Sequence, residues 1–208
     1  MADALPADRE IAFWSGVDQT TRFFMGSSDV QRALRKLAAI LDRLEIPYAV
    51  VGALALNEWG YRRATLDIDL LLTSEGLEQL KREILGRGYL EKFPGSRGMR
   101  DTETGVDIDV VVAGEFPGDG KPKAVAFPDP ALAAVRGESV ALLPLEKLIE
   151  LKLASGSSAP HRLRDLADVL ELVRVLALPR ELGRALDPSV GAKYDELWNA
   201  AQSADPEP

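Results

Sequence analysis

The sequence predicts an α/β fold of the α+β kind, with a small mixed sheet flanked by helices and followed by a C-terminal helical segment. Two observations predict it. Amphipathic helical patterns alternate with short apolar runs through the first half of the chain, and helical patterns dominate the end. The run VDIDVVV is rich in valine, a residue favoured in strands.

The first half supplies most of the predicted sheet. Ser28 is an N-cap residue before a helix with apolar positions three and four apart, and Pro47 ends that helix. Glycines at 60 and 88 are predicted helix stops, and the segment 94–98 is a predicted turn. The remaining elements expected here are strands over 48–51, 66–72, 89–93 and 106–112, and helices over 53–59 and 74–87.

The second half is expected to begin with a Gly/Pro-rich loop over 114–122. Pro144 suits the first turn of a helix. The further elements expected are short strands over 124–127 and 139–142, helices over 144–152, 162–176 and 179–186, and a linker, SGSSAP, over 155–160.

These patterns divide the chain into four parts: an N-terminal arm (1–27), an α/β core (28–143), a helical segment (144–200) and a frayed tail (201–208). The arm shows no clear periodicity of apolar residues. Its aromatic cluster suggests that part of it packs against another surface, and consists of Phe13, Trp14, Phe23 and Phe24.

Composition excludes several kinds of site. The 208 residues include no cysteine and one histidine, so thiolate chemistry and multi-histidine metal sites are excluded and a metal ion would need oxygen ligands. The net charge of −8 opposes nucleic-acid binding by the chain as a whole. The sequence has no secretory signal pattern and no apolar run long enough for a membrane span, so we expect a cytoplasmic protein without a membrane partner.

Two Asp-x-Asp pairs stand inside apolar, strand-like runs: Asp67 with Asp69, and Asp107 with Asp109. On a strand, residues two apart point to the same face, so each pair places two negative charges side by side. Such a pair is costly to bury without a cation. The plainer interpretation is the solvent face of an edge strand, and it stays open, above all for the second pair.

Gly52 follows a buried-looking strand and precedes a short helix. Such a glycine lets the backbone approach a ligand closely, and free N–H groups at a helix start favour an anion. Alone, this junction is usually structural. Beside a carboxylate pair on the next strand, it predicts a site for phosphate and metal.

The segment VVGALALNEWGYRRATLDIDLLL resembles the signature of the nucleotidyltransferase-fold superfamily: a glycine turn, a helix, and two carboxylates on the next strand. The spacing of Arg63, Thr65, Asp67 and Asp69 is similar to that of small bacterial members, which include AbiEii-type toxins. VDIDVV resembles the strand of the third carboxylate. LIELKLASG and RLRDLADVLEL resemble the helical part that follows, so the likeness spans roughly residues 30–176.

The resemblance implies transfer of a nucleoside monophosphate from a nucleoside triphosphate, such as ATP, to an acceptor hydroxyl, with Mg²⁺ or Mn²⁺ as cofactor. Asp67, Asp69 and Asp109 would be catalytic and hold the metal ions, with Asp109 as metal ligand or general base. The expected nucleotide-binding residues are Gly52, Ala53, Arg63, Thr65 and Lys152, and Asp107 and Asp165 are additional candidates.

Plainer interpretations remain open for several of these side chains. Arg63 and Lys152 could be surface charges, and Asp165 and Asp168 could share a solvated helix face. His161, in the expected linker, is predicted to be a surface residue. Arg97 and Arg100 near a glycine-containing loop could meet an acceptor such as RNA, although the net charge opposes this.

Three functions compete at this point. The first is an active nucleotidyltransferase: either a toxin with a cognate antitoxin as partner, or a modifier of a protein, an RNA or a small molecule. The second is a degenerate member that binds a nucleotide or a protein without chemistry, which is favoured by Ala53 because active members usually carry Gly or Ser there. The third is a structural cation site on an unrelated α/β domain.

Overall fold

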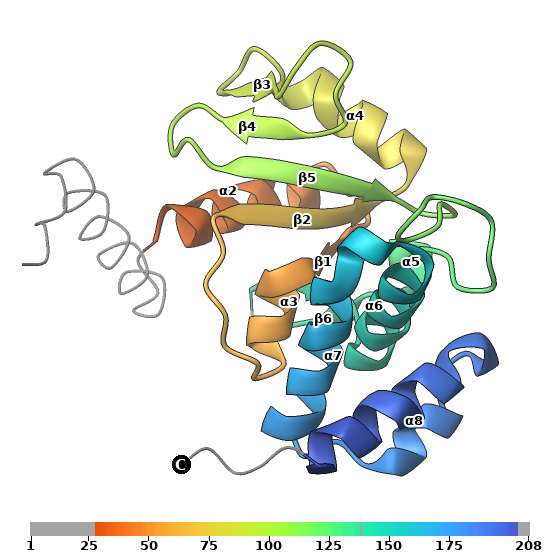
Figure 1. Cartoon of the computed structure of the whole chain (residues 1–208). Coiled ribbons are helices and arrows are strands. Elements are labelled where there is room, and N and C mark those ends of the chain that lie inside the picture. Colours follow the sequence, from red (N-terminus) through yellow and green to blue (C-terminus); the bar gives the residue numbers. More distant parts are fainter. Residues whose placement is uncertain (1–27, 138, 204–208) are drawn as a thin grey trace, which may run out of the picture.

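The computed structural model describes residues 28–137 and 139–203. The sequence interpretations of the N-terminal arm and of residues 204–208 lie outside these residues. Within them the chain is a mixed α/β protein, as predicted, with a seven-stranded sheet in the order β3-β4-β5-β2-β1-β7-β6 (Figure 1).

The centre of the sheet is formed by three strands: β1 (Ala49–Val51), β2 (Asp67–Leu72) and β5 (Asp107–Val112). β2 runs antiparallel to β1 and parallel to β5, with Asp67 opposite Asp107 and Asp69 opposite Asp109. On β2 the residues Ile68, Leu70 and Leu72 are fully buried, as expected for the face that packs on the core.

The remaining strands extend the sheet on both sides. β3 (Tyr89–Glu91) pairs with β4 (Met99–Asp101), which pairs with β5, all antiparallel. On the other side β7 (Ala141–Leu142) runs parallel to β1, and β6 (Val135–Arg136) pairs antiparallel with β7.

The helices before β5 follow the predicted periods. α2 (Asp29–Arg43) begins with a capping box between Ser28 and Gln31, and its apolar face is buried. α3 (Gly52–Glu58) begins directly after β1, and α4 (Ser74–Ile84) is capped by Thr73. In Figure 1, α2 passes behind β2 and β5.

The second half adds α5 (Pro130–Ala133), α6 (Leu145–Ser158), a 3₁₀ turn η1 (Pro160–Arg162), α7 (Leu163–Val175), a 3₁₀ turn η2 (Arg180–Arg184) and α8 (Pro188–Ser203). Figure 1 shows α6, α7 and α8 gathered beyond the β1 side of the sheet. Their buried residues, such as Val169 and Tyr194, join those of the sheet in one continuous core.

Several predicted boundaries are wrong. The expected linker 155–160 is helical as far as Ser158, because Gly156 lets α6 pack closely on Leu166 of α7. The expected helix 179–186 is only η2, and residues 124–127 form no strand, although Phe127 exchanges backbone hydrogen bonds with Gly114 and Glu115. The sequence interpretation omitted β4, α5, β6 and α8.

None of the helices within the described ranges has both the length and the apolar character needed to cross a membrane.

Candidate active site

Four carboxylates lie on one face of the central strands. Asp67 and Asp69 share a face of β2, and their in-register partners on β5 are Asp107 and Asp109. Side chains opposite each other in register point to the same side of a sheet. We call this set, Asp67, Asp69, Asp107 and Asp109, the carboxylate square. Like charges this close repel one another, so the arrangement favours cations nearby.

Gly52 gives Asp69 its position. Val51, the last residue of β1, pairs with Asp69, and Gly52 turns the chain with φ of +64°. A Cβ atom at Gly52 would lie 2.8 Å from Cγ of Asp69 and closer still to its Oδ2. Only glycine therefore allows both this backbone turn and this carboxylate position.

Burial and charge both act on Asp69. Burial, followed by the negative charges of Asp67 and Asp109, raises the pKa of its carboxyl to about 6, although Lys152 and Arg63 act in the opposite direction. The charged form of Asp69 is thus disfavoured where it stands. A cation bound between these carboxylates would relieve that cost, which fits a metal site with oxygen ligands.

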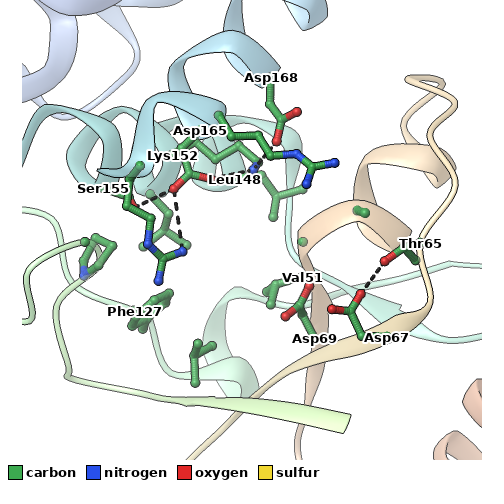
Figure 2. A pocket seen from close by; sticks show the side chains of 18 of the residues that line it. Val51, Thr65, Asp67, Asp69, Phe127, Leu148, Lys152, Ser155, Asp165 and Asp168 are labelled. Carbon is green, nitrogen blue, oxygen red and sulfur yellow. Dashed lines mark hydrogen bonds and ion pairs between the residues drawn. The ribbon is translucent and has the colours of Figure 1, made fainter. Parts of the chain in front are cut away.

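A cavity of about 560 Å³ opens in front of Asp67 and Asp69. Figure 2 shows these two side chains on one side, and Lys152, Ser155, Asp165 and Asp168 on the other. The opposite side, formed by α6, η1 and α7, is called here the helical wall, and its polar residues are Lys152, Ser155, His161, Arg162, Arg164, Asp165 and Asp168. The volume lies within the range of about 300–1,000 Å³ typical of small-molecule sites.

The helical wall is joined to the loop before β2 by an ion-pair network. Arg63 Nη1 donates to both carboxylate oxygens of Asp168, at 2.8 and 2.9 Å. Lys152 Nζ donates to Asp168 at 2.7 Å and to Asp165 at 3.0 Å, and Ser155 Oγ donates to Asp165 at 2.6 Å. The two predicted phosphate contacts, Arg63 and Lys152, therefore line the cavity as ion-pair partners of α7.

Side-chain hydrogen bonds fix the loop that carries Arg63. Asn57 Oδ1 accepts from the backbone N–H of Arg63 at 2.7 Å, and Asn57 Nδ2 donates to the carbonyls of Arg63 and Ala53. Thr65 Oγ1 donates to Asp67 Oδ1. Thr65 thus orients a carboxylate in this structure, and Asn57 links the loop to α3.

Basic side chains contact the other two members of the carboxylate square, Asp107 and Asp109. Lys92 Nζ lies 2.9 Å from Asp109 Oδ1 and 3.5 Å from Asp107 Oδ2, and Arg100 Nε donates to Asp107 at 2.6 Å. In this arrangement, no three acidic or histidine side chains of the described residues form a group that could hold a metal ion. The donor types fit Mg²⁺, but Asp109 is turned toward Lys92.

The cavity gathers eight of the predicted site residues: Gly52, Ala53, Arg63, Thr65, Asp67, Asp69, Lys152 and Asp165. Asp107 and Asp109 do not line it. His161 is exposed, as predicted, but it also lies at the cavity, because it belongs to η1 rather than to a linker. Arg97 pairs with Glu115 and Arg100 with Asp107, so neither is a free basic contact.

The sequence interpretation did not assign Phe127, Ser155, Arg162 or Arg164 to the site. It left open whether Asp168 lies on a solvated helix face, and in the structure Asp168 is buried. Helical spacing could have placed Ser155 beside Lys152, and Asp168 beside Asp165. No local pattern could have shown that Phe127, from a loop, reaches the same cavity.

Comparison with known proteins gives similarity to solved structures alone. No protein-family model and no curated protein sequence matches the chain. A proposed nucleotidyltransferase from Thermotoga maritima is 20% identical, with a TM-score of 0.48, over 67% of this chain and 91% of that one. The enzyme ANT(2″)-Ia, solved with adenylyl-2″-tobramycin, is 18% identical, with a TM-score of 0.45, over 83% and 96%.

JHP933 from Helicobacter pylori is 15% identical, with a TM-score of 0.47, over 83% of this chain and 89% of that one. At these identities and scores the likeness concerns the path of the chain alone.

Proposed function

We propose that this chain is a metal-dependent nucleotidyltransferase, which moves a nucleoside monophosphate from a nucleoside triphosphate to an acceptor hydroxyl and releases pyrophosphate. One observation carries the proposal. A same-face aspartate pair, Asp67 and Asp69, opens on a cavity of about 560 Å³ whose opposite wall is rich in basic side chains. Carboxylates that hold a metal ion, facing groups that bind phosphate, are what phosphoryl transfer needs.

Asp67 and Asp69, with Asp109 from the neighbouring strand, would hold Mg²⁺ or Mn²⁺. When bound, the metal would neutralise the charge that develops on the reacting phosphate oxygens. Thr65 keeps Asp67 oriented, and Gly52 keeps Asp69 against the backbone. Asp109 is the side chain proposed to accept the proton of the acceptor hydroxyl or to hold the ion that activates it.

The helical wall suggests how the phosphates would be bound. The side chains of His161 and Arg164 line the cavity, and neither has an ion-pair or hydrogen-bond partner among the described residues. Arg162 is 4.0 Å from its only described ion-pair partner, Asp165. These side chains are freer than Arg63 and Lys152 to contact a triphosphate, whereas Arg63 and Lys152 lower the cost of charge on Asp69.

A toxin role with a cognate antitoxin remains a proposal that comes from the sequence resemblance, and a cytoplasmic location remains a proposal that comes from the lack of a secretory signal pattern and of a membrane-spanning apolar run. A protein, an RNA and a small molecule are all acceptor classes to test. The net charge of −8 makes RNA the least favoured of the three.

The second candidate function is nucleotide binding without transfer. It is favoured by Ala53, which lines the cavity where a serine could have offered a hydroxyl to a phosphate. The two candidates differ in one respect, namely whether pyrophosphate leaves the bound nucleotide.

Thermal unfolding with each nucleoside triphosphate and Mg²⁺ tests both functions. Ligand that binds the native state stabilises it by about 2.7 kcal/mol at a concentration of 100 times Kd. We expect nucleotide and metal together to raise the melting temperature more than metal alone, and this additional rise to be lost in Asp67→Asn/Asp69→Asn. The control is Asp195→Asn/Glu196→Gln on α8, which removes two acidic charges outside the cavity.

The responding nucleotide is then used with a label in its α-phosphate. Release of pyrophosphate together with label on an acceptor supports transfer. A thermal shift without pyrophosphate release supports the second candidate function. If no nucleotide adds to the melting temperature reached with metal, both candidates are ruled out, and a shift with metal that no nucleotide increases would leave a structural cation site.

A further inference from the structure

The third carboxylate of the proposed site already has a cation, supplied by the chain itself. Lys92 Nζ donates to Asp109 Oδ1 at 2.9 Å and lies 3.5 Å from Asp107 Oδ2. The ammonium group thus bridges the two carboxylates of β5, next to the pair on β2. The Lys92 side chain is 29% exposed, so it is partly withdrawn from solvent.

The loop that carries Lys92 is shaped for this contact. Lys92 follows β3, and its backbone N–H donates to the carbonyl of Gly98 at 3.1 Å. A Cβ atom at Gly98 would lie 2.7 Å from Cδ of Lys92 and 3.0 Å from Asp109 Oδ1. Because Gly98 has no side chain, the space through which the Lys92 side chain reaches Asp109 stays open.

Further contacts hold the same loop in place. The backbone N–H of Gly98 donates to Ser96 Oγ at 3.0 Å, and Ser96 is buried. Lys81 of α4 donates to the carbonyl of Ser96 and to Glu91. The position of Lys92 is thus supported by a buried residue and by a neighbouring helix, unlike that of an isolated surface lysine.

We propose that Lys92 is a positioning residue that competes with a divalent metal ion for Asp109. Its ammonium group holds the carboxylate away from Asp67 and Asp69 until a metal ion displaces it. The inference rests on the proposed function, because it assumes that Asp109 completes the metal site of Asp67 and Asp69.

The competition follows from charge. An ammonium group and a divalent ion cannot both lie in contact with one carboxylate oxygen, and they repel each other strongly at a few ångströms. Lysine suits such an exchange, since its compact charge sits on a flexible four-carbon stem. The metal must therefore break the contact between Lys92 and Asp109, and its affinity is weakened by the cost of doing so.

The experiment measures binding of Mn²⁺ alone to the full chain, by titration calorimetry and by the loss of the free-ion electron-resonance signal. The test variant is Lys92→Met, which keeps an unbranched side chain of nearly the same length and removes its charge. Arg97→Met is the matched control. It removes one positive charge from the same loop, but its partner is Glu115, outside the carboxylate square. Lys92→Arg tests whether a restored charge restores the weaker binding.

We expect Lys92→Met to bind Mn²⁺ at least about tenfold more tightly than the wild type, as removal of a charge a few ångströms from the ion implies. Arg97→Met should stay within about twofold of the wild type, because a change in exposed loop charge is largely screened. Lys92→Arg should also stay within about twofold, because it keeps the positive charge. Binding that appears in Lys92→Met but is undetectable in the wild type would support the same inference.

Three results would overturn the inference. Equal affinity of the wild type and Lys92→Met would remove the competition and leave the proposed function standing, as would equal gains in Lys92→Met and Arg97→Met. If no variant binds Mn²⁺, the metal site itself fails and the inference fails with it. Melting temperatures of all four proteins, measured without metal, separate a change in affinity from a loss of fold.

Discussion

A single glycine decides how close the carboxylate of Asp69 can come to the backbone. Gly52 has a positive φ and faces Asp69 without a side chain, so that Asp69 is half-buried and lines the cavity. This position disfavours the charged form of Asp69, because burial and its acidic neighbours raise the pKa of its carboxyl to about 6. At the residue scale, then, the site combines a backbone conformation that favours glycine with a carboxylate whose charge Arg63 and Lys152 compensate only in part.

Substitution of Gly52 by alanine should be far more harmful than the same change at a comparable turn. We expect Gly52→Ala to lower the free energy of unfolding by about 2–4 kcal/mol, since it adds a steric clash to the cost of a left-handed backbone. Gly86→Ala is the control: its φ is +74°, but nothing lies within 4 Å of an added Cβ, so about 1 kcal/mol is expected.

Urea unfolding of both variants measures the difference. Equal losses would mean that Asp69 moves away without cost, and that Gly52 is required only for its backbone angle.

At the scale of elements, the interior strands follow their sequence pattern and the connections between helices do not. β2 and β5 were expected from their apolar runs, and both formed within one residue of the predicted limits. The segment SGSSAP was expected as a linker, but α6 continues through most of it. Small residues are typical of linkers, yet they also permit close helix packing, and here Gly156 packs against Leu166 of α7.

This packing can be tested at Gly156. Alanine within a helix is normally more stable than glycine by about 1 kcal/mol. An added Cβ would lie 2.5 Å from Cγ of Leu166, so we expect Gly156→Ala to be destabilising by about 1–3 kcal/mol.

A double-mutant cycle supplies the control. In a Leu166→Ala background the clash is absent, and Gly156→Ala should then stabilise the protein, as measured by denaturant unfolding. Destabilisation of the same size in both backgrounds would show that the contact with Leu166 is not the cause.

At the scale of the whole molecule, the cavity exists because the sheet and the C-terminal helices are held against each other. Arg63, in the loop before β2, and Lys152, on α6, both pair with Asp168 on α7. The side chain of Asp168 is only 6% exposed, so its charge depends on these partners. One carboxylate thus joins the two sides of the cavity.

Removal of that carboxylate should cost more than an ordinary ion pair. We expect Asp168→Ala to lower the free energy of unfolding by about 3 kcal/mol, because it leaves two largely buried cations with one partner fewer each. Asp195→Ala, which breaks the exposed pair with Arg180, should cost less than about 1 kcal/mol. Chemical denaturation of both variants at one pH checks this, and similar losses would contradict a special role for Asp168.

The sequence by itself determined the α/β class, the glycine turn at Gly52 and the two aspartate pairs on strands. These depend on local rules: the period of apolar residues, the freedom of glycine and the alternation of side chains along a strand. The tertiary structure alone decided that β5 lies beside β2 in parallel register, because strand order depends on packing between distant segments.

The sequence likewise did not show which charged side chains form ion pairs with one another. From the sequence, Arg63 and Lys152 could be phosphate contacts or plain surface charges. The structure joins them to Asp168, and it joins Asp109 to Lys92, through contacts that cross up to 105 positions of the chain. Long charged side chains reach many neighbours, so only the folded arrangement selects which opposite charge each one meets.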